Sequence, residues 1–375
     1  MMGGMGNRSG VIARAAVVVC AFVLSVLPGT AGASAVTAGP GDGETDAAQP
    51  AAVTAEGRER LLFRFKDPRI TESSGLAVSR THKGIVYTHN DSGEEPVFFA
   101  VGPDGRTRAR FTLRGAAARD WEAMALSTDP RTGRGVLWFA DIGDNLNGAW
   151  PNISIYRVEE PAVLRDATLP AVRYRFRYAD GARNAEGIMV HPRTGRLYVV
   201  SKEFAGSVYI APKKLRTDRV NVLRRVGPAP IMATDAAYSP DGSTFVIRTY
   251  ISATLYSAPG KVVGRISMPP LKQAESIAYT LDGRALLTGS EGERSPLYEV
   301  PIPARLLDKV KKQDEQGKKG GAVRSDGGAS AQPSPVAAAE PEPEPDGVPP
   351  RMILLWVGVA VGATAVIALI ARLAR

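Results

Sequence analysis

The stretch Pro130-Arg131-Thr132-Gly133-Arg134 decides the fold, because an identical copy occurs at Pro192–Arg196. Each copy directly precedes a short apolar stretch, Val136–Phe139 in one case and Leu197–Val200 in the other. The glycine accepts the positive φ that a tight hairpin turn requires. The same place in later repeats is taken by other turns, Pro240-Asp241-Gly242 and Leu281-Asp282-Gly283. The repeat is therefore built from β-hairpins.

A four-strand unit can be aligned around these turns. Its first strand begins with a polar residue followed by small or apolar ones, at Ser74, Glu122, Glu186, Asp235 and Glu275. Its third strand carries an aromatic residue, at Phe98, Tyr156, Tyr209, Tyr256 and Tyr298. The period is about 50 residues, and an insertion near Glu159–Pro170 lengthens one interval. Short strands with this period predict an all-β propeller of five four-stranded blades, or of six if one repeat is degenerate.

The last repeat lacks a fourth strand, whereas the apolar stretch Leu61–Phe65 stands unpaired before the first. Pairing this stretch with the strand around Leu297–Val300 would close the ring and remove two exposed sheet edges. The sequence therefore predicts closure by the N-terminal strand.

The segments outside the repeats predict an exported, membrane-anchored chain. Residues 1–35 have the basic start, apolar stretch and A-x-A sites of a signal peptide. Residues 36–59 form a disordered lead-in, 60–305 the propeller, and 306–350 a disordered stalk rich in Pro, Glu and Lys. Residues 351–371 are apolar enough for a helix across the roughly 30 Å hydrocarbon core, and 372–375 form a basic cytoplasmic tail. The propeller should thus lie outside the cytoplasm.

The composition limits the classes of molecule that the protein is expected to bind. The formal charge of +9 is spread along the chain, without the basic block and interleaved aromatics of a nucleic-acid binder. Affinity for anionic wall polymers or lipid headgroups is the expected consequence. The one cysteine, Cys20, leaves with the signal peptide, so the mature protein has no disulfide.

Candidate site residues gather at one mouth of the predicted central channel, because an inner strand begins where its antiparallel neighbour ends. The rim candidates are Glu72, His89, Asp120, Glu122, Glu186, Glu203, Asp235, Glu275 and Glu291. Oxygen-bearing side chains on two neighbouring strand ends predict a divalent cation, most simply Ca²⁺, held by Asn90, Asp91, Asp141, Asp144 and Asn145.

Four motifs, Glu72–Ala77, His89–Gly93, Asp120–Ala125 and Asp141–Asn145, resemble in this order a family of bacterial extracytoplasmic propellers. That family is similar to the phytase-like and esterase-like propeller proteins. The resemblance covers residues 60–305 and is strongest in the first two repeats. It implies a propeller fold, export and calcium binding, and it brings no substrate.

Structural interpretations stand beside these. An acid at the start of an inner strand can hydrogen-bond backbone amides of the next blade, and Asp141–Asn145 can be a simple turn. Nucleophilic catalysis and zinc are disfavoured, because the sequence has no G-x-S-x-G and the mature chain has no Cys.

Two classes of function remain. One is a surface module that binds a ligand or protein partner on the acidic, Ca²⁺-loaded face. The other is a metal-dependent hydrolase, either a phosphoesterase or a glycosidase that uses two carboxylates such as Glu122 and Glu275.

Overall fold

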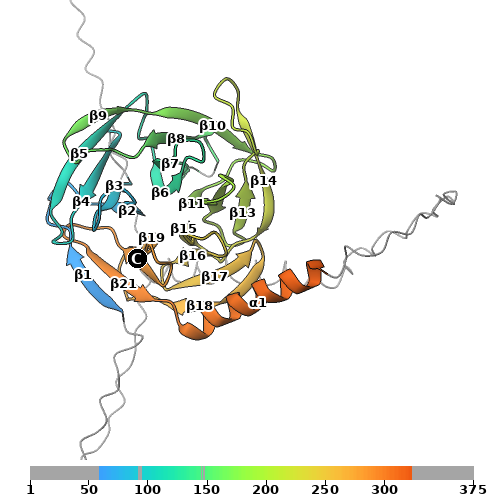
Figure 1. Cartoon of the computed structure of the whole chain (residues 1–375). Helices are drawn as coiled ribbons and strands as arrows, with labels where there is room; N and C mark the ends of the chain where they lie inside the picture. Colours follow the sequence, from blue (N-terminus) through green and yellow to red (C-terminus); the bar gives the residue numbers. More distant parts are fainter. Residues whose placement is uncertain (1–58, 92–94, 145, 147, 323–375) are drawn as a thin grey trace, which may run out of the picture. The chain divides into compact units, whose positions relative to one another are not determined.

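The computed structural model describes residues 59–91, 95–144, 146 and 148–322. Over these residues the chain forms strands arranged around a common centre, followed by one helix (Figure 1). None of the described helical sequence is long and apolar enough to cross a membrane. The predicted signal peptide, almost all of the lead-in, the end of the stalk, the membrane helix at 351–371 and the tail lie outside the described residues.

The innermost strands surround the centre in sequence order. Each of them contacts the next one, and the last contacts the first, so the inner strands form a closed circle. They are β2 (Ser73–Val78), β6 (Trp121–Thr128), β11 (Ala185–Val190), β15 (Ala233–Tyr238) and β19 (Ser276–Tyr279). This is a propeller-like arrangement.

Antiparallel strands continue outward from each inner strand. The first two runs use β3 (Val86–Asn90), β4 (Val97–Val101) and β5 (Thr107–Arg114), then β7 (Gly135–Asp141), β8 (Ile153–Glu159) and β10 (Val172–Tyr178). The next two use β12 (Leu197–Ser201), β13 (Ser207–Ile210) and β14 (Asn221–Pro228), then β16 (Phe245–Thr249), β17 (Ser252–Ala258) and β18 (Lys261–Ser267). The last run uses β20 (Ala285–Gly289) and β21 (Pro296–Pro301).

The predicted closing strand is confirmed. β1 (Arg60–Arg64) pairs antiparallel with β21, with Leu61 opposite Tyr298 and Phe63 opposite Leu297. The final run therefore contains the first and last strands of the described chain.

The predicted insertion has a structure of its own. It contains β9 (Ala167–Pro170), which pairs in parallel with β5 of the first run. The following strand, β10, pairs with β8 and also in parallel with β14 of the third run. These parallel pairs join the runs, so the described strands form sheets of four, five, eight and four strands.

Apolar side chains fill the spaces between the runs. Four of the five aligned aromatic residues are buried, and Tyr298 is half-buried next to the closing strand. The helix α1 (Ala304–Ala322) packs Leu306 and Val310 on the core beside β18. An irregular stalk was expected from residue 306, so the structure differs there: Leu306 and Val310, four residues apart, lie on one face of the helix and let it begin on the sheet.

Candidate functional site

A local irregularity of the inner strands places the acids at the mouth of the channel. In β6 the pairing with β7 skips Glu122, and in β11 the pairing with β12 skips Glu186. Glu275 precedes the first paired residue of β19. Bulged residues leave the regular ladder and can be aimed away from it. Glu122, Glu186 and Glu275 are all at most 5% exposed.

Asp235 differs from these three acids in its strand register. The skipped residue in β15 is Thr234, and Asp235 pairs with Arg248. The fully buried carboxylate of Asp235 accepts hydrogen bonds from the backbone N–H groups of Ala236 and of Ile277 in the next inner strand, each at 2.7 Å. Asp235 thus has the structural contacts that were considered as the alternative for the rim acids.

Three carboxylates converge on one point. Single oxygen atoms of Asp91, Asp120 and Glu122 all lie within 4.8 Å of one another. Gly143 lies against this cluster, because a Cβ there would stand 2.2 Å from Oε1 of Glu122 and 2.4 Å from Oδ2 of Asp120. Asp91 and Asp120 were predicted in two different groups, and the structure brings them together with Glu122.

The cluster is electrostatically strained without a counterion. Burial, followed by the charges of Asp120 and Glu186, raises the pKa of Asp91 to about 8. Burial and the charges of Glu186, Asp91 and Asp120 raise the pKa of Glu122 well above its usual value. Burial also raises the pKa of Asp120, against the opposing charge of Arg119. Burial and mutual repulsion thus disfavour the charged forms of these carboxylates, and a bound cation would favour them.

Lys202 neutralises part of the channel and was not selected from the sequence as a site residue. Its Nζ lies 3.0 Å from Oε1 of Glu186 and 3.6 Å from Oε1 of Glu275. Burial opposes the charge on Lys202, but the two carboxylates outweigh it and raise its pKa. The hydroxyl of Tyr250 donates to Oε1 of Glu275 at 2.8 Å. The sequence signal for this role was a lysine at the end of a second strand, on the same side of the predicted ring as Glu186 and Glu275.

Two carboxylate oxygens at the cluster lack an N–H or hydroxyl donor among the described residues. They are Oε2 of the buried Glu186 and Oδ1 of Asp91. Glu186 shares a side-chain hydrogen bond with Glu122, and it acts electrostatically on both Asp91 and Glu122. A buried acceptor that lacks a donor is costly, so the oxygen of Asp91 in particular is consistent with a cation or a further donor at this point.

Several predicted metal ligands are engaged with the backbone instead. Oδ1 of Asn90 accepts the N–H groups of Thr71 and Glu72, each at 3.2 Å. The two carboxylate oxygens of Asp144 accept the N–H groups of Ala149 and Trp150, at 3.2 and 3.1 Å.

Asp141 lies next to Arg119. Its Oδ1 accepts the N–H group of Asp120 at 3.0 Å and lies 3.6 Å from Nε of Arg119. Burial raises the pKa of Asp141 to about 6, although Arg119 opposes the shift. Arg119 itself stacks over the Trp150 ring, with 4.2 Å between Cζ and the ring centroid. Asn145 lies outside the described residues.

The remaining rim candidates surround the cluster. His89 is fully buried and packs edge-on against Trp121, and burial lowers its pKa to about 4. The charge of Glu72 contributes to the raised pKa of Asp91. Glu203 pairs with Arg183 at 3.2 Å.

Glu291 accepts a hydrogen bond from Gln273 at 2.7 Å. Burial and a hydrogen bond with Glu275 raise the pKa of Glu291 to about 8.

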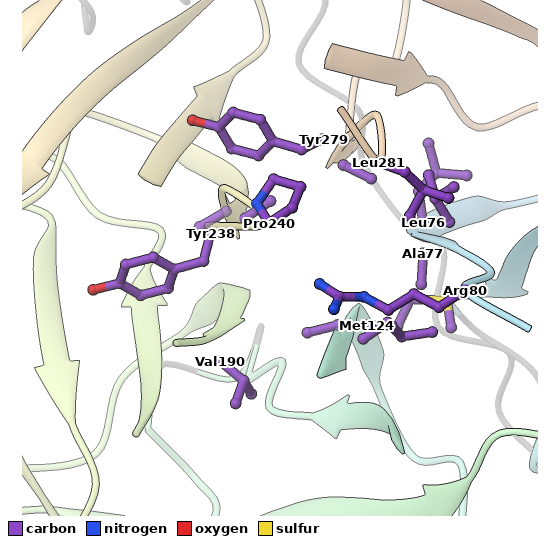
Figure 2. A pocket seen from close by; sticks show the side chains of 15 residues that line it. Leu76, Ala77, Arg80, Met124, Val190, Tyr238, Pro240, Tyr279 and Leu281 are labelled. Carbon is purple, nitrogen blue, oxygen red and sulfur yellow. The ribbon is translucent and has the colours of Figure 1, made fainter. Parts of the chain in front are cut away.

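The opposite end of the channel is apolar. A small cavity of about 60 Å³ is lined there by the far ends of the inner strands, including Leu76, Met124, Val190 and Tyr279. Figure 2 shows these side chains around the opening, with Arg80 extending toward its middle. The Nη1 atom of Arg80 donates to Oγ1 of Thr128 at 3.1 Å.

Comparisons with known proteins add little to this geometry. No protein-family model matches the chain, and no curated protein matches it. Among solved structures, the chain is similar to a gluconolactonase from Xanthomonas campestris, with 14% sequence identity and a TM-score of 0.39. The match covers 66% of this chain and 91% of that one. Similarity at this level transfers neither a residue role nor a reaction.

Proposed function

We propose that this protein binds a divalent cation at the acidic mouth of its channel and uses the cation-loaded face to capture a ligand or protein partner. The observation that carries the proposal is the convergence of Asp91, Asp120 and Glu122 within 4.8 Å, with Oδ1 of Asp91 buried and without a hydrogen-bond partner among the described residues. A cation stabilises the ionised carboxylates that burial and mutual repulsion disfavour. A bound cation would therefore account for the clustering of these buried acids.

The donor set fits Ca²⁺. Two oxygens on one Ca²⁺ ion, each at roughly 2.3–2.6 Å, are separated by at most about 5 Å, and the three carboxylate oxygens all lie within 4.8 Å of one another, which permits a shared ion. Mg²⁺ at about 2.1 Å requires a tighter and more regular arrangement. Asp91, Asp120 and Glu122 supply the protein ligands, and coordination positions not filled by protein remain for water or ligand oxygens. A ligand that carries carboxylate, phosphate or vicinal hydroxyl oxygens would bind there.

We further propose five blades for the propeller. The circle of contacts among the five inner strands and the completion of the last run by β1 support this number. The proposed cation would then lie at the start of neighbouring inner strands, between the first and second blades.

A metal-dependent hydrolase is the second candidate, on one observation. Because Glu291 has a pKa of about 8, it retains a proton at neutral pH and is suited to protonate a leaving group. Ca²⁺ would supply Lewis-acid stabilisation of the substrate's negative charge. Release of nitrophenol from p-nitrophenyl phosphate by the wild type, lost in Glu291→Gln, would favour this candidate over a binding module. The glycosidase version is weakened because Glu275 already contacts Lys202 and Tyr250.

The test of the cation site is a thermal melt of the purified chain in Ca²⁺ and in EDTA. At a Ca²⁺ concentration 100 times Kd, the free energy of unfolding rises by about 2.7 kcal/mol. For a domain of this size the melting temperature should rise by about 5–10 °C. Asp91→Asn and Glu122→Gln should abolish the shift.

Asp241→Asn is the matched control, because Asp241 accepts hydrogen bonds within a hairpin turn away from the cluster. It should keep the full Ca²⁺ response. Identical wild-type melts in the two buffers, together with no heat of Ca²⁺ binding by calorimetry, would refute the proposed function.

We propose, from the sequence, that the propeller lies outside the cytoplasm and is tethered by residues 351–371. Phe204 is 85% exposed and therefore suits a Phe204→Cys substitution as a reporter. A membrane-impermeant thiol reagent should label this cysteine in intact cells. Labelling only after lysis would contradict the proposed location.

A further inference from the structure

The strand β10 has a strict alternation, Val172-Arg173-Tyr174-Arg175-Phe176-Arg177-Tyr178. Successive side chains of a strand point to opposite faces. Phe176 and Tyr178 are buried in the core, whereas Arg177 is exposed. The arginines therefore share the other face of β10, on which Arg173 and Arg177 are exposed and Arg175 is half-buried beside Ser154 of β8.

The neighbouring strand β14 extends this face. In the parallel pairing, Arg177 lies opposite Val222, and the buried Tyr178 lies opposite the buried Leu223. Paired residues point to the same side of a sheet, and so do residues two apart along one strand. Arg224, two residues after Val222 and exposed, thus lies on the same face as Arg177. We call Arg175, Arg177 and Arg224 the arginine row.

The arginine row has no counterions. None of its members forms an ion pair within the described part of the chain, while other surface arginines do, such as Arg60 with Glu299 at 3.1 Å and Arg134 with Glu159 at 2.8 Å. Arg173, at the end of the row, donates to Oγ of Ser154 at 2.9 Å. Guanidinium groups that repel one another along a line are stabilised by an external anion.

We infer that the arginine row binds an extended polymer of repeating phosphates. Arg175 and Arg177 are about 7 Å apart along β10, and Arg224 continues from them on the adjacent strand β14, so the row offers three successive anchors on one face. Guanidinium groups bind phosphate through paired hydrogen bonds. A short succession of anchors suits a chain-like polyanion better than the plane of a membrane. No aromatic residue is exposed beside the row in β10 or β14, so the bases of a nucleic acid would find no stacking surface there.

The test measures binding of the full-length purified chain to immobilised long-chain inorganic polyphosphate over a range of NaCl concentrations. EDTA is present throughout, so the result does not depend on the cation site. The variant R175Q/R177Q/R224Q should bind roughly tenfold more weakly at moderate salt. The slope of log K against log salt should fall by about 2, because each phosphate contact on a single-stranded polyanion contributes about 0.7.

The control R60Q/R106Q/R131Q removes the same charge from arginines whose side chains are 68%, 69% and 87% exposed elsewhere. It should leave the slope nearly unchanged. A second variant, R175K/R177K/R224K, keeps the charge and should lose affinity while retaining most of the slope. Equal weakening by the row and control variants would overturn the inference, and so would binding to phosphatidylglycerol vesicles without binding to polyphosphate. Unchanged melting temperatures establish that each variant is folded.

Discussion

The hydrogen bond that Asp235 makes between two neighbouring inner strands can be tested directly by mutation. Asp235 is fully buried on β15, and its two oxygens accept the N–H groups of Ala236 and of Ile277 on β19. Arg248, also fully buried, donates Nε to the carbonyl of Ala274 at 3.0 Å. Burial lowers the pKa of Arg248 to about 10 and raises that of Asp235, and the attraction between the two side chains opposes both shifts. Asp235→Ala removes both acceptors and this attraction.

The cost follows from the groups left behind. A buried donor that loses its acceptor costs about 1–3 kcal/mol, and here two backbone donors are affected. We therefore expect Asp235→Ala to lower the free energy of unfolding by about 3–4 kcal/mol. At about 2–4 °C per kcal/mol, the melting temperature should fall by roughly 6–15 °C. Asp235→Asn keeps one acceptor and should lose about half as much.

The assay is thermal and urea unfolding of the three proteins in EDTA. Asp104→Ala is the control, because Asp104 makes an exposed ion pair with Arg108, and such surface pairs contribute little to stability. A melting temperature for Asp235→Ala within about 2 °C of the wild type would refute the reasoning. It would mean that the inner strands do not depend on this carboxylate for their attachment.

Three further predictions follow from the site and the closing strand. Gly143→Ala should push the carboxylates of Glu122 and Asp120 apart and weaken Ca²⁺ binding about tenfold, as measured by calorimetry. The melting temperature of this variant in EDTA should change little. An unchanged affinity for Ca²⁺ would mean that the cation binds elsewhere. The pKa of Glu291 is raised, so native Glu291 keeps a proton that the unfolded chain releases, and stability in EDTA should fall as pH rises from 5 to 8. After allowance for solvent screening, Glu291→Gln should remove about 1–1.5 kcal/mol of this fall in urea titrations, and an equal slope in the variant would disprove it. A mature chain that starts at Lys66, without β1, should lose soluble expression, and normal yield with an unchanged melt would contradict the closure.

The repeat structure was predictable because propeller strands are local. The turns at Gly133 and Gly195 have the positive φ that their sequence indicates, at 70° and 63°. The unpaired β1 also indicated its own partner. The parallel contacts of β9 and β10 were not predictable, because pairing between distant strands has no local sequence signal.

The site was predictable only as a region. Strand ends identified which side chains lie near the mouth, but the direction of a side chain depends on the bulges, and these are not visible in the residue pattern. One skipped residue turns Glu122 toward the cluster, while Asp235, one place later in its strand, bonds the next inner strand. Asn90 and Asp144 have suitable ligand chemistry, and nothing in the sequence shows that backbone N–H groups already occupy their oxygens.

The closing strand also determines how the domain responds to a pulling force. Because β1 and β21 are antiparallel, Arg60 lies beside Glu299, and the two ends of the described β-structure leave the sheet at the same edge. Tension between these ends would break the hydrogen bonds between β1 and β21 one after another (unzipping geometry). Strands loaded in this way separate at low force. The first turns of α1 stand between the sheet and everything that follows, with Leu306 and Val310 held in the core. A pull from the C-terminal side is therefore borne first by these apolar contacts, and the seam of the ring is loaded only after they yield.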